Sequence, residues 1–187
     1  LFPYTTLFRS YRLSRLRYVF PLGLFAALFL DGSLSKIFAG FFFHYPYAMV
    51  SQLVIVWLVC SYFFEGDIQI PLIGFSVVAG IFCALYYSGI LGLFMFLYPM
   101  VVGLTKLLAK YITSSFPMIV LVFLSDLTVF ELFNYWAYAA VGIAKVGLGG
   151  FLLDTLLPTL LLNLVYLLFL YFPLQKLITW AADIERR

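Results

Sequence analysis

Five polar side chains fall inside or near the ends of long apolar stretches of this 187-residue chain. A carboxylate at the middle of a membrane-spanning helix costs about 2.5–3.5 kcal/mol on insertion scales, so such groups face a bundle interior or a wet cavity. One interpretation is a polar pocket or proton path. The other, which we favour, is hydrogen-bonded packing within a helical bundle. Gln52 shares this setting, and the five residues are Asp31, Asp126, Glu131, Asn134 and Asn163.

The spacing of these groups argues against an enzyme. Glu131 and Asn134 are three residues apart and share a helix face. Asp126 and Glu131 are the one candidate pair for intramembrane catalysis, but a five-residue spacing places them about 140° apart on an ideal helix. Two such groups converge poorly on a single cavity, so no catalytic residues are assigned.

Asp31 is followed by Gly32 and Ser33, a combination that can interrupt a helix. An acidic side chain is favourable near a helix start, because it accepts hydrogen bonds from the first N–H groups. We therefore expect a break in the first apolar stretch at this point, with Asp31 beside a new helix start.

The remaining reactive residue types predict no cofactor or metal site. His44 is the only histidine and is expected in a loop or at the membrane interface. Cys60 and Cys83 lie in apolar stretches and match no metal-binding spacing. The glycine cluster near Gly147 follows no strand and is expected to form a turn.

The elements that carry these residues are expected to be membrane helices. The chain is 65% hydrophobic and 10% charged, with a mean hydropathy of +1.11. About 20 apolar residues in a helix cross the hydrocarbon core, and lipid offers no hydrogen bonds to any other backbone form. We predict an all-α integral membrane protein, a six-transmembrane-helix bundle in one domain (11–187). The expected spans are about 18–43, 47–64, 68–87, 90–112, 116–144 and 151–180.

The basic residues predict the orientation. Nine of the 11 Lys and Arg fall in the tails and in every second gap between spans, and only Lys36 and Lys145 fall in the other gaps. Basic residues concentrate on the cytoplasmic side, so both termini are expected to be cytoplasmic. A nucleic-acid-binding patch is the disfavoured interpretation, because these residues flank spans, where they would at most meet anionic lipid. The nine are Arg9, Arg12, Arg15, Arg17, Lys106, Lys110, Lys176, Arg186 and Arg187.

Small residues recur at every fourth position of the third predicted span, at Ser76, Gly80, Ala84 and Ser88. Such a stripe lets two helix backbones approach closely in a membrane. We expect a tight helix contact here, within the chain in preference to one with a partner.

The first ten residues, Leu1 to Ser10, read as translated adapter sequence. We expect residues 1–10 to be foreign to the fold, and we exclude them from it.

Three stretches together resemble one family. Phe29-Leu30-Asp31-Gly32-Ser33-Leu34-Ser35 closes the first span, and Gly89-Ile90-Leu91-Gly92-Leu93 leads to Leu97-Tyr98-Pro99 in the fourth. Leu156-Leu157-Pro158-Thr159-Leu160-Leu161-Leu162-Asn163 continues to Tyr171-Phe172-Pro173-Leu174. In order and spacing, over nearly everything after Ser10, the chain resembles the rod shape-determining protein MreD family.

This resemblance implies a scaffold in the bacterial cytoplasmic membrane that helps to determine cell shape. It implies a fold similar to that of the substrate-binding subunits (S-components) of energy-coupling-factor transporters. The implied partners are the single-span protein MreC, the actin-like MreB and the elongation glycosyltransferase and transpeptidase that synthesise peptidoglycan. The resemblance brings no catalytic residues, and Asp31 and Asn163, which fall in matching stretches, are expected to stabilise the bundle.

The alternative is a solute-binding S-component-like subunit of a vitamin transporter. It predicts a pocket at the outer side, lined by polar side chains, and a docking surface with an Ala-xxx-Ala pair on the first helix. Here Ala26 and Ala27 are adjacent and Ala39 is distant, which counts against transport.

Overall fold

The computed structural model describes residues 15–65, 70–87, 92–112, 114–144 and 146–183. Over these residues the chain forms helices and no strands. The expected foreign stretch, 1–10, lies outside them. In chain order the elements are α1 (Leu16–Ile37), α2 (Ala39–Phe42), α3 (Leu53–Phe64), α4 (Leu72–Tyr87), α5 (Leu93–Ala109), α6 (Phe116–Ala140), α7 (Leu148–Gly150), the π-helix η1 (Phe151–Leu156) and α8 (Leu157–Asp183).

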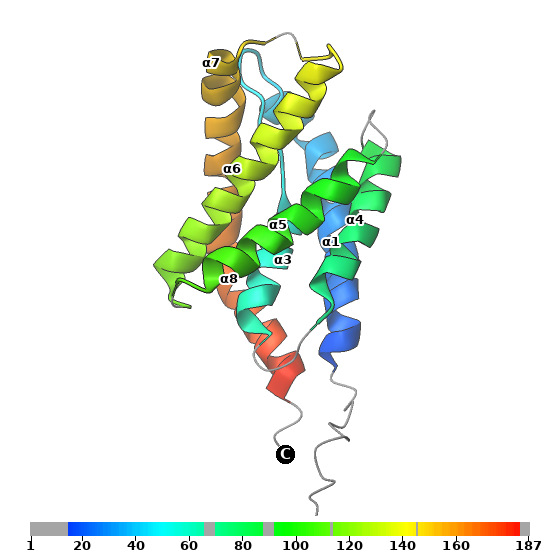
Figure 1. Ribbon diagram of the computed structural model, residues 1–187, viewed down its shortest axis with the longest axis vertical. Coiled ribbons are helices and arrows are strands. Elements are labelled where there is room, and N and C mark those ends of the chain that lie inside the picture. Colours follow the sequence, from blue (N-terminus) through cyan, green and yellow to red (C-terminus); the bar gives the residue numbers. More distant parts are fainter. Residues whose placement is uncertain (1–14, 66–69, 88–91, 113, 145, 184–187) are drawn as a thin grey trace, which may run out of the picture.

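Within the described residues, three helical stretches are long and apolar enough to cross a membrane: Leu16–Ile37, Phe116–Ala140 and Leu148–Ala182. Three shorter apolar helices accompany them, Leu53–Phe64, Leu72–Tyr86 and Leu93–Ala109. Figure 1 shows α1 and α8 running close to the long axis, with α6 inclined to it and α5 crossing obliquely. The prediction of an all-helical protein is thus confirmed over the described residues, and three of its helical stretches have the length and apolarity that a membrane span needs.

The short helix α3 forms the centre of the bundle. Every residue from Leu53 to Ser61 is buried, on all sides of the helix. It contacts α1, α4, α5, α6 and α8. A helix that is apolar all round is suited to such a position, since no face has to meet water. Trp57 of α3 packs against Gly23 of α1, where a Cβ atom would overlap the indole ring.

Two expectations about the first two spans are wrong. The helix α1 continues through Asp31, Gly32 and Ser33, and ends only at Ile37. The predicted second span, 47–64, is helical only from Leu53. Residues 47–52 have no regular secondary structure and enter the bundle as an irregular segment (Figure 1). We call residues 47–52 the inserted segment. Asp31 does lie at a helix start, but it is the start of α3.

The stripe on α4 meets α5 at very short range. Gly80 is buried, and a Cβ atom there would overlap the backbone carbonyl oxygen of Phe94 and lie 2.7 Å from the Cα atom of Met95. Ser76 and Ala84 are buried on the same helix, whereas Ser88 lies outside the described residues. The close approach of α4 and α5 therefore depends on the missing side chain at Gly80.

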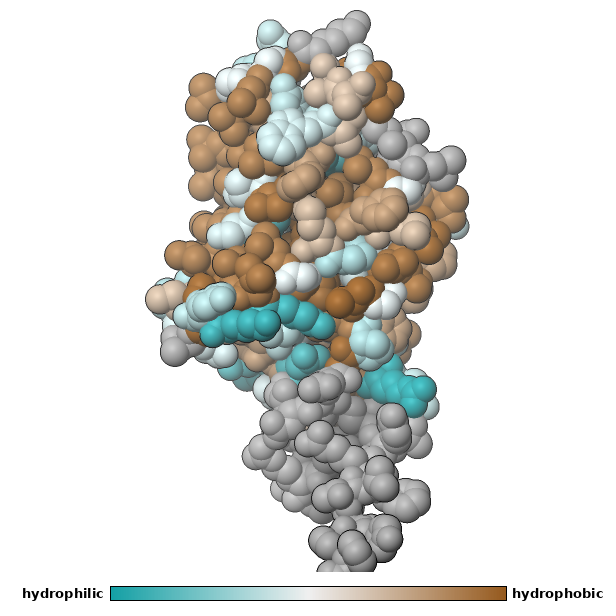
Figure 2. Space-filling model, viewed as in Figure 1, coloured by the Kyte–Doolittle hydropathy of each residue, from teal (hydrophilic) through white to brown (hydrophobic). Residues whose placement is uncertain are grey.

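Basic residues gather at one end of the bundle, which we call the basic end. The guanidinium carbon of Arg15, just before α1, lies 5.3 Å from the ring centroid of Trp180 in α8, so the start of α1 and the end of α8 are neighbours. Figure 2 shows the corresponding hydrophilic band below a largely hydrophobic surface. Lys106 lies close enough to Glu65, just after α3, to influence that carboxyl group.

Replacement of Gly80 tests the contact between α4 and α5. Gly80→Ala is expected to lower the free energy of unfolding by about 1–3 kcal/mol, the usual effect of overpacking, because the new methyl group meets backbone atoms that cannot rotate away. The measurement is unfolding in mixed micelles followed by circular dichroism. Gly74→Ala is the matched control, since Gly74 is an exposed residue of α4 with no atom within 4 Å of the added Cβ. Equal unfolding of the two variants would contradict the proposed contact.

Candidate functional site

The carboxylate of Asp31 caps the first turn of α3. Its Oδ1 accepts hydrogen bonds from Leu53 N (2.8 Å) and from the Ser51 hydroxyl (2.5 Å), and its Oδ2 accepts one from Val54 N (3.1 Å). The first N–H groups of a helix have no partner within the helix, and negative charge is favourable there. Because α3 begins inside the bundle, the cap comes from a neighbouring helix.

Asn163 of α8 holds the inserted segment from the opposite side. Its Oδ1 accepts from Gln52 N at 2.8 Å, and its Nδ2 donates to Val50 O at 2.7 Å and to Thr159 O at 2.8 Å. Both N–H groups of the amide and its carbonyl oxygen are therefore used. A single buried side chain thus replaces the pairing that a β-ladder would give to this stretch of backbone.

The first half of the inserted segment binds to residues at the irregular start of the last helical stretch. Pro158 has no N–H group, so the carbonyl oxygen of Asp154, four residues earlier, has no donor at the usual α-helical position. Ala48 N donates to that oxygen at 2.8 Å. Two residues later, Val50 N donates to the Thr159 hydroxyl at 3.2 Å. The π-helix η1 and Pro158 thus expose acceptors that the inserted segment uses.

Glu131 of α6 is a further polar side chain that, like Asp31 and Asn163, binds the inserted segment. It is buried and accepts a hydrogen bond from the side-chain amide of Gln52 at 3.1 Å. Asn134, one turn later, also bonds to Glu131, as expected for residues that share a helix face. The Oδ1 atom of Asn134 is buried without a partner. Helices α1, α6 and α8 thus each direct a polar side chain to the same short stretch of chain.

Asp126 belongs to a different contact. It is fully buried, and its Oδ2 accepts from the Thr105 hydroxyl of α5 at 2.6 Å. Its Oδ1 has no hydrogen-bond partner. Asp126 and Glu131 therefore have different partners, on different elements, and the structure does not join them in one reactive pair.

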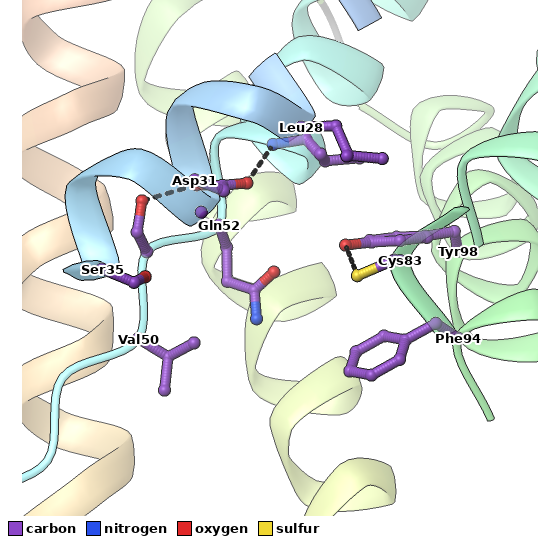
Figure 3. Close-up of a pocket in the computed structure, with 11 residues that line it drawn as sticks. Leu28, Asp31, Ser35, Val50, Gln52, Cys83, Phe94 and Tyr98 are labelled. Atoms are coloured by element: carbon purple, nitrogen blue, oxygen red, sulfur yellow. Dashed lines mark hydrogen bonds between the residues drawn. The ribbon is translucent and has the colours of Figure 1, made fainter. Parts of the chain in front are cut away.

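A cavity of about 250 Å³ lies beside the inserted segment. Figure 3 shows Gln52, Phe94 and Tyr98 directed toward it, with the Tyr98 hydroxyl donating to Cys83 Sγ at 3.6 Å. The lining comes from α1, the inserted segment with the start of α3, α4 and α5. Its residues are Leu28, Asp31, Gly32, Ser35, Val50, Ser51, Gln52, Val54, Cys83, Phe94 and Tyr98.

The sequence predicted that Asp31, Asn163 and Glu131 would lie inside the bundle, but it did not identify several other residues of the site. Ser51 and Thr159 bind through single hydroxyl groups within apolar sequence, and no spacing rule identifies them. Thr105 and Tyr98 were missed for the same reason. The one usable signal was Pro158, since a proline within a helix removes the α-helical donor to the carbonyl oxygen four residues earlier.

Within the described part of the chain, no group of three or more His, Cys, Asp or Glu residues is arranged to hold a metal ion. His44 is exposed in the loop after α2, and Cys60 and Cys83 are buried free thiols. What the arrangement offers chemically is hydrogen bonding, to its own backbone and toward the cavity.

Comparison of the chain with protein-family models, with curated proteins and with solved structures found no match.

Loss of the Asn163 amide should destabilise the fold. Asn163→Leu leaves Gln52 N and Val50 O buried without partners, and each such group costs about 1–3 kcal/mol, so we expect a loss of about 2–5 kcal/mol. Unfolding in mixed micelles measures this. Gln175→Leu makes the same kind of change in a partly buried residue of α8. If both variants unfold alike, the amide does not hold the segment.

The Asp31 cap can be tested by a change that keeps its shape. Asp31→Asn retains one acceptor but presents an N–H₂ group to a backbone N–H, so we expect destabilisation by about 1–3 kcal/mol. Amide exchange at Leu53 and Val54 should accelerate in parallel. Asp154→Asn is the control, because the contact of Asp154 with the inserted segment is made by its backbone carbonyl. Unchanged exchange in Asp31→Asn would rule out the cap.

Proposed function

We propose that this chain is a six-crossing membrane scaffold of the MreD type, which works by packing against neighbouring proteins. One observation supports it most. Two of the stretches that carry the resemblance, 29–35 and 156–163, are distant in sequence, yet Asp31 binds Ser51 and Asn163 binds Val50 of the same inserted segment. Residues that would define the family are therefore residues that hold this bundle together.

Six crossings are possible only if the three shorter apolar helices, α3, α4 and α5, also cross the membrane. The 12 residues of α3 cover about 18 Å, and the six residues of the inserted segment add about 20 Å, which together exceed the ~30 Å of hydrocarbon. Helices α4 and α5, with 16 and 17 residues, cover about 24–26 Å, which modest local thinning of the bilayer accommodates. Non-helical backbone at membrane depth is tolerated where protein binds and covers it, and the inserted segment is half-buried from residue 48 and buried at Ser51 and Gln52.

The charge distribution supports an orientation with both termini in the cytoplasm. Among the described basic residues, Arg15, Arg17, Lys106, Lys110 and Lys176 belong to the basic end, and Lys36 closes α1 at the other. The cytoplasmic side of a bacterial inner membrane is where such residues concentrate. We therefore place the protein in the bacterial cytoplasmic membrane.

In this role the chain would hold the membrane helix of MreC. It would thereby connect MreB inside the cell with the glycosyltransferase and transpeptidase of peptidoglycan elongation. No catalytic step is assigned to the chain itself. Exposed apolar side chains cover α1, α4, α6 and α8, so the bundle has lateral surface for both lipid and a partner helix.

The cavity favours a second candidate, a solute-binding subunit similar to a transporter S-component. It is lined by the amide of Gln52 and the hydroxyl groups of Ser35 and Tyr98. A neighbouring gene for a coupling ATPase would favour this candidate, and one for a single-span coiled-coil protein would favour the scaffold.

Depletion in a rod-shaped or ovoid host separates the two candidates. For a scaffold we expect cells to become round as the protein is lost, because side-wall synthesis loses its anchor, while uptake of vitamins is unaffected. Microscopy and uptake of labelled vitamins are measured in the same cultures. Restoration by the wild type and by Gly74→Ala, but not by a Gly80→Leu variant, ties the effect to the folded bundle. Unchanged shape with lost uptake would refute the scaffold.

A further inference from the structure

The cavity beside the inserted segment has two chemically different sides. One side is polar and is formed by the inserted segment and α1, which contribute Gln52 and Ser35. The other is formed by Phe94 and Tyr98 of α5, whose rings lie 5.9 Å apart between centroids. Figure 3 shows the amide of Gln52 and the hydroxyl of Tyr98 directed toward the space between these sides.

The polar side is fixed in position before any ligand arrives. One N–H of the Gln52 amide is bound to Glu131, and the backbone N–H of Gln52 is bound to Asn163. A primary amide also carries a second N–H and a carbonyl oxygen, which can bind side by side to a planar edge with one acceptor and one donor. Because Gln52 is only 5% exposed, such a pairing would form with little competition from water.

The aromatic side is equally rigid. Tyr98 is 2% exposed and stacks on Phe130 of α6, with centroids 5.4 Å apart and planes 23° apart. Phe94 packs against the same Phe130 ring. Flat aromatic faces select flat ligands, since offset stacking stabilises a ring by about 0.5–1.5 kcal/mol beyond its buried area.

Charge and size restrict the ligand further. Among the described residues no Lys or Arg lines the cavity, and their one acidic side chain there, Asp31, already accepts three hydrogen bonds from Ser51 and α3. An anion would be repelled, and a cation would have to compete for an occupied carboxylate. The volume, about 250 Å³, exceeds the ~150 Å³ that suffices for benzene in an engineered protein cavity. It therefore suits a molecule of about one or two fused rings.

We propose that this cavity is a binding site for an uncharged, planar small molecule whose edge carries an adjacent hydrogen-bond donor and acceptor, as a cyclic amide does. Gln52 pairs with that edge, the Tyr98 hydroxyl donates to the acceptor of the edge in place of its weak bond to Cys83 Sγ, and Phe94 covers one face. The site goes beyond the scaffold proposal and gives a ligand class to the second candidate.

The test uses the full chain in lipid nanodiscs and three bicyclic probes of similar shape. Quinolinone has the amide edge, naphthalene has none, and naphthoate carries a negative charge. Binding is titrated by saturation-transfer NMR. The Val50→Phe variant serves as the background for partition into lipid, because its side chain fills the cavity while the backbone bonds of Val50 are retained. Its circular dichroism and unfolding must match those of the wild type.

We expect saturable binding of quinolinone to the wild type, its loss in Val50→Phe, and weaker binding of the other two probes. Tyr98→Phe should weaken quinolinone binding about threefold to tenfold, the effect of one hydrogen bond. Tyr171→Phe is the matched control, a buried tyrosine of α8 that does not line the cavity.

Several results would overturn the proposal. They are equal binding of naphthalene and quinolinone, stronger binding of naphthoate, retained binding in Val50→Phe, or equal effects of the two tyrosine substitutions. Absence of saturable binding by the folded wild type would also overturn it. Failure of depletion to alter cell shape would count against the scaffold alone and would leave these binding results unchanged.

Discussion

The start of α3 lies inside the bundle, and its free N–H groups are the constraint on which the rest of the arrangement depends. At the membrane surface water would satisfy them, but in the interior each unpaired group costs free energy. Asp31 supplies the acceptors from α1. Because its carboxylate must reach α3, the contact fixes the height of α1 relative to the central helix. The position of α3, enclosed by five other helices, then follows from its uniformly apolar sequence.

The inserted segment extends this constraint to the other side of the bundle. Its backbone is bound by Asn163, by Thr159 and by the carbonyl oxygen of Asp154, all within the last helical stretch. The buried polar residues thus stabilise the protein by satisfying backbone that lipid could not. The same bonds hold Gln52 against Glu131 and leave room beside it. A cavity with polar walls is therefore a by-product of a central stretch, residues 47–64, that is helical only from Leu53.

Much of this could be predicted from the sequence. Apolar length predicted the helices, and the cost of buried charge predicted that Asp31, Asn163 and Glu131 would face inward. The small-residue spacing located the close approach at Gly80. The inserted segment could not be predicted, because Ala48, Met49 and Val50 are as apolar as a helix requires. Its bonds to Asp154, Thr159 and Asn163 join residues more than 100 positions apart, and hydrophobic periodicity carries no information about such distant partners.

The distance between Gln52 and Asn163 has a consequence for how the protein is made. Asn163 leaves the ribosome 111 residues after Gln52, a delay of roughly 5–20 s at ordinary rates of translation. During that interval the nascent chain holds a stretch of backbone without its final acceptors. In the proposed membrane bundle, this stretch therefore has to be held by the translocon, by lipid headgroups or by an insertase until the last helix is synthesised. Biogenesis of this fold should accordingly be completed only after synthesis of its C-terminal third.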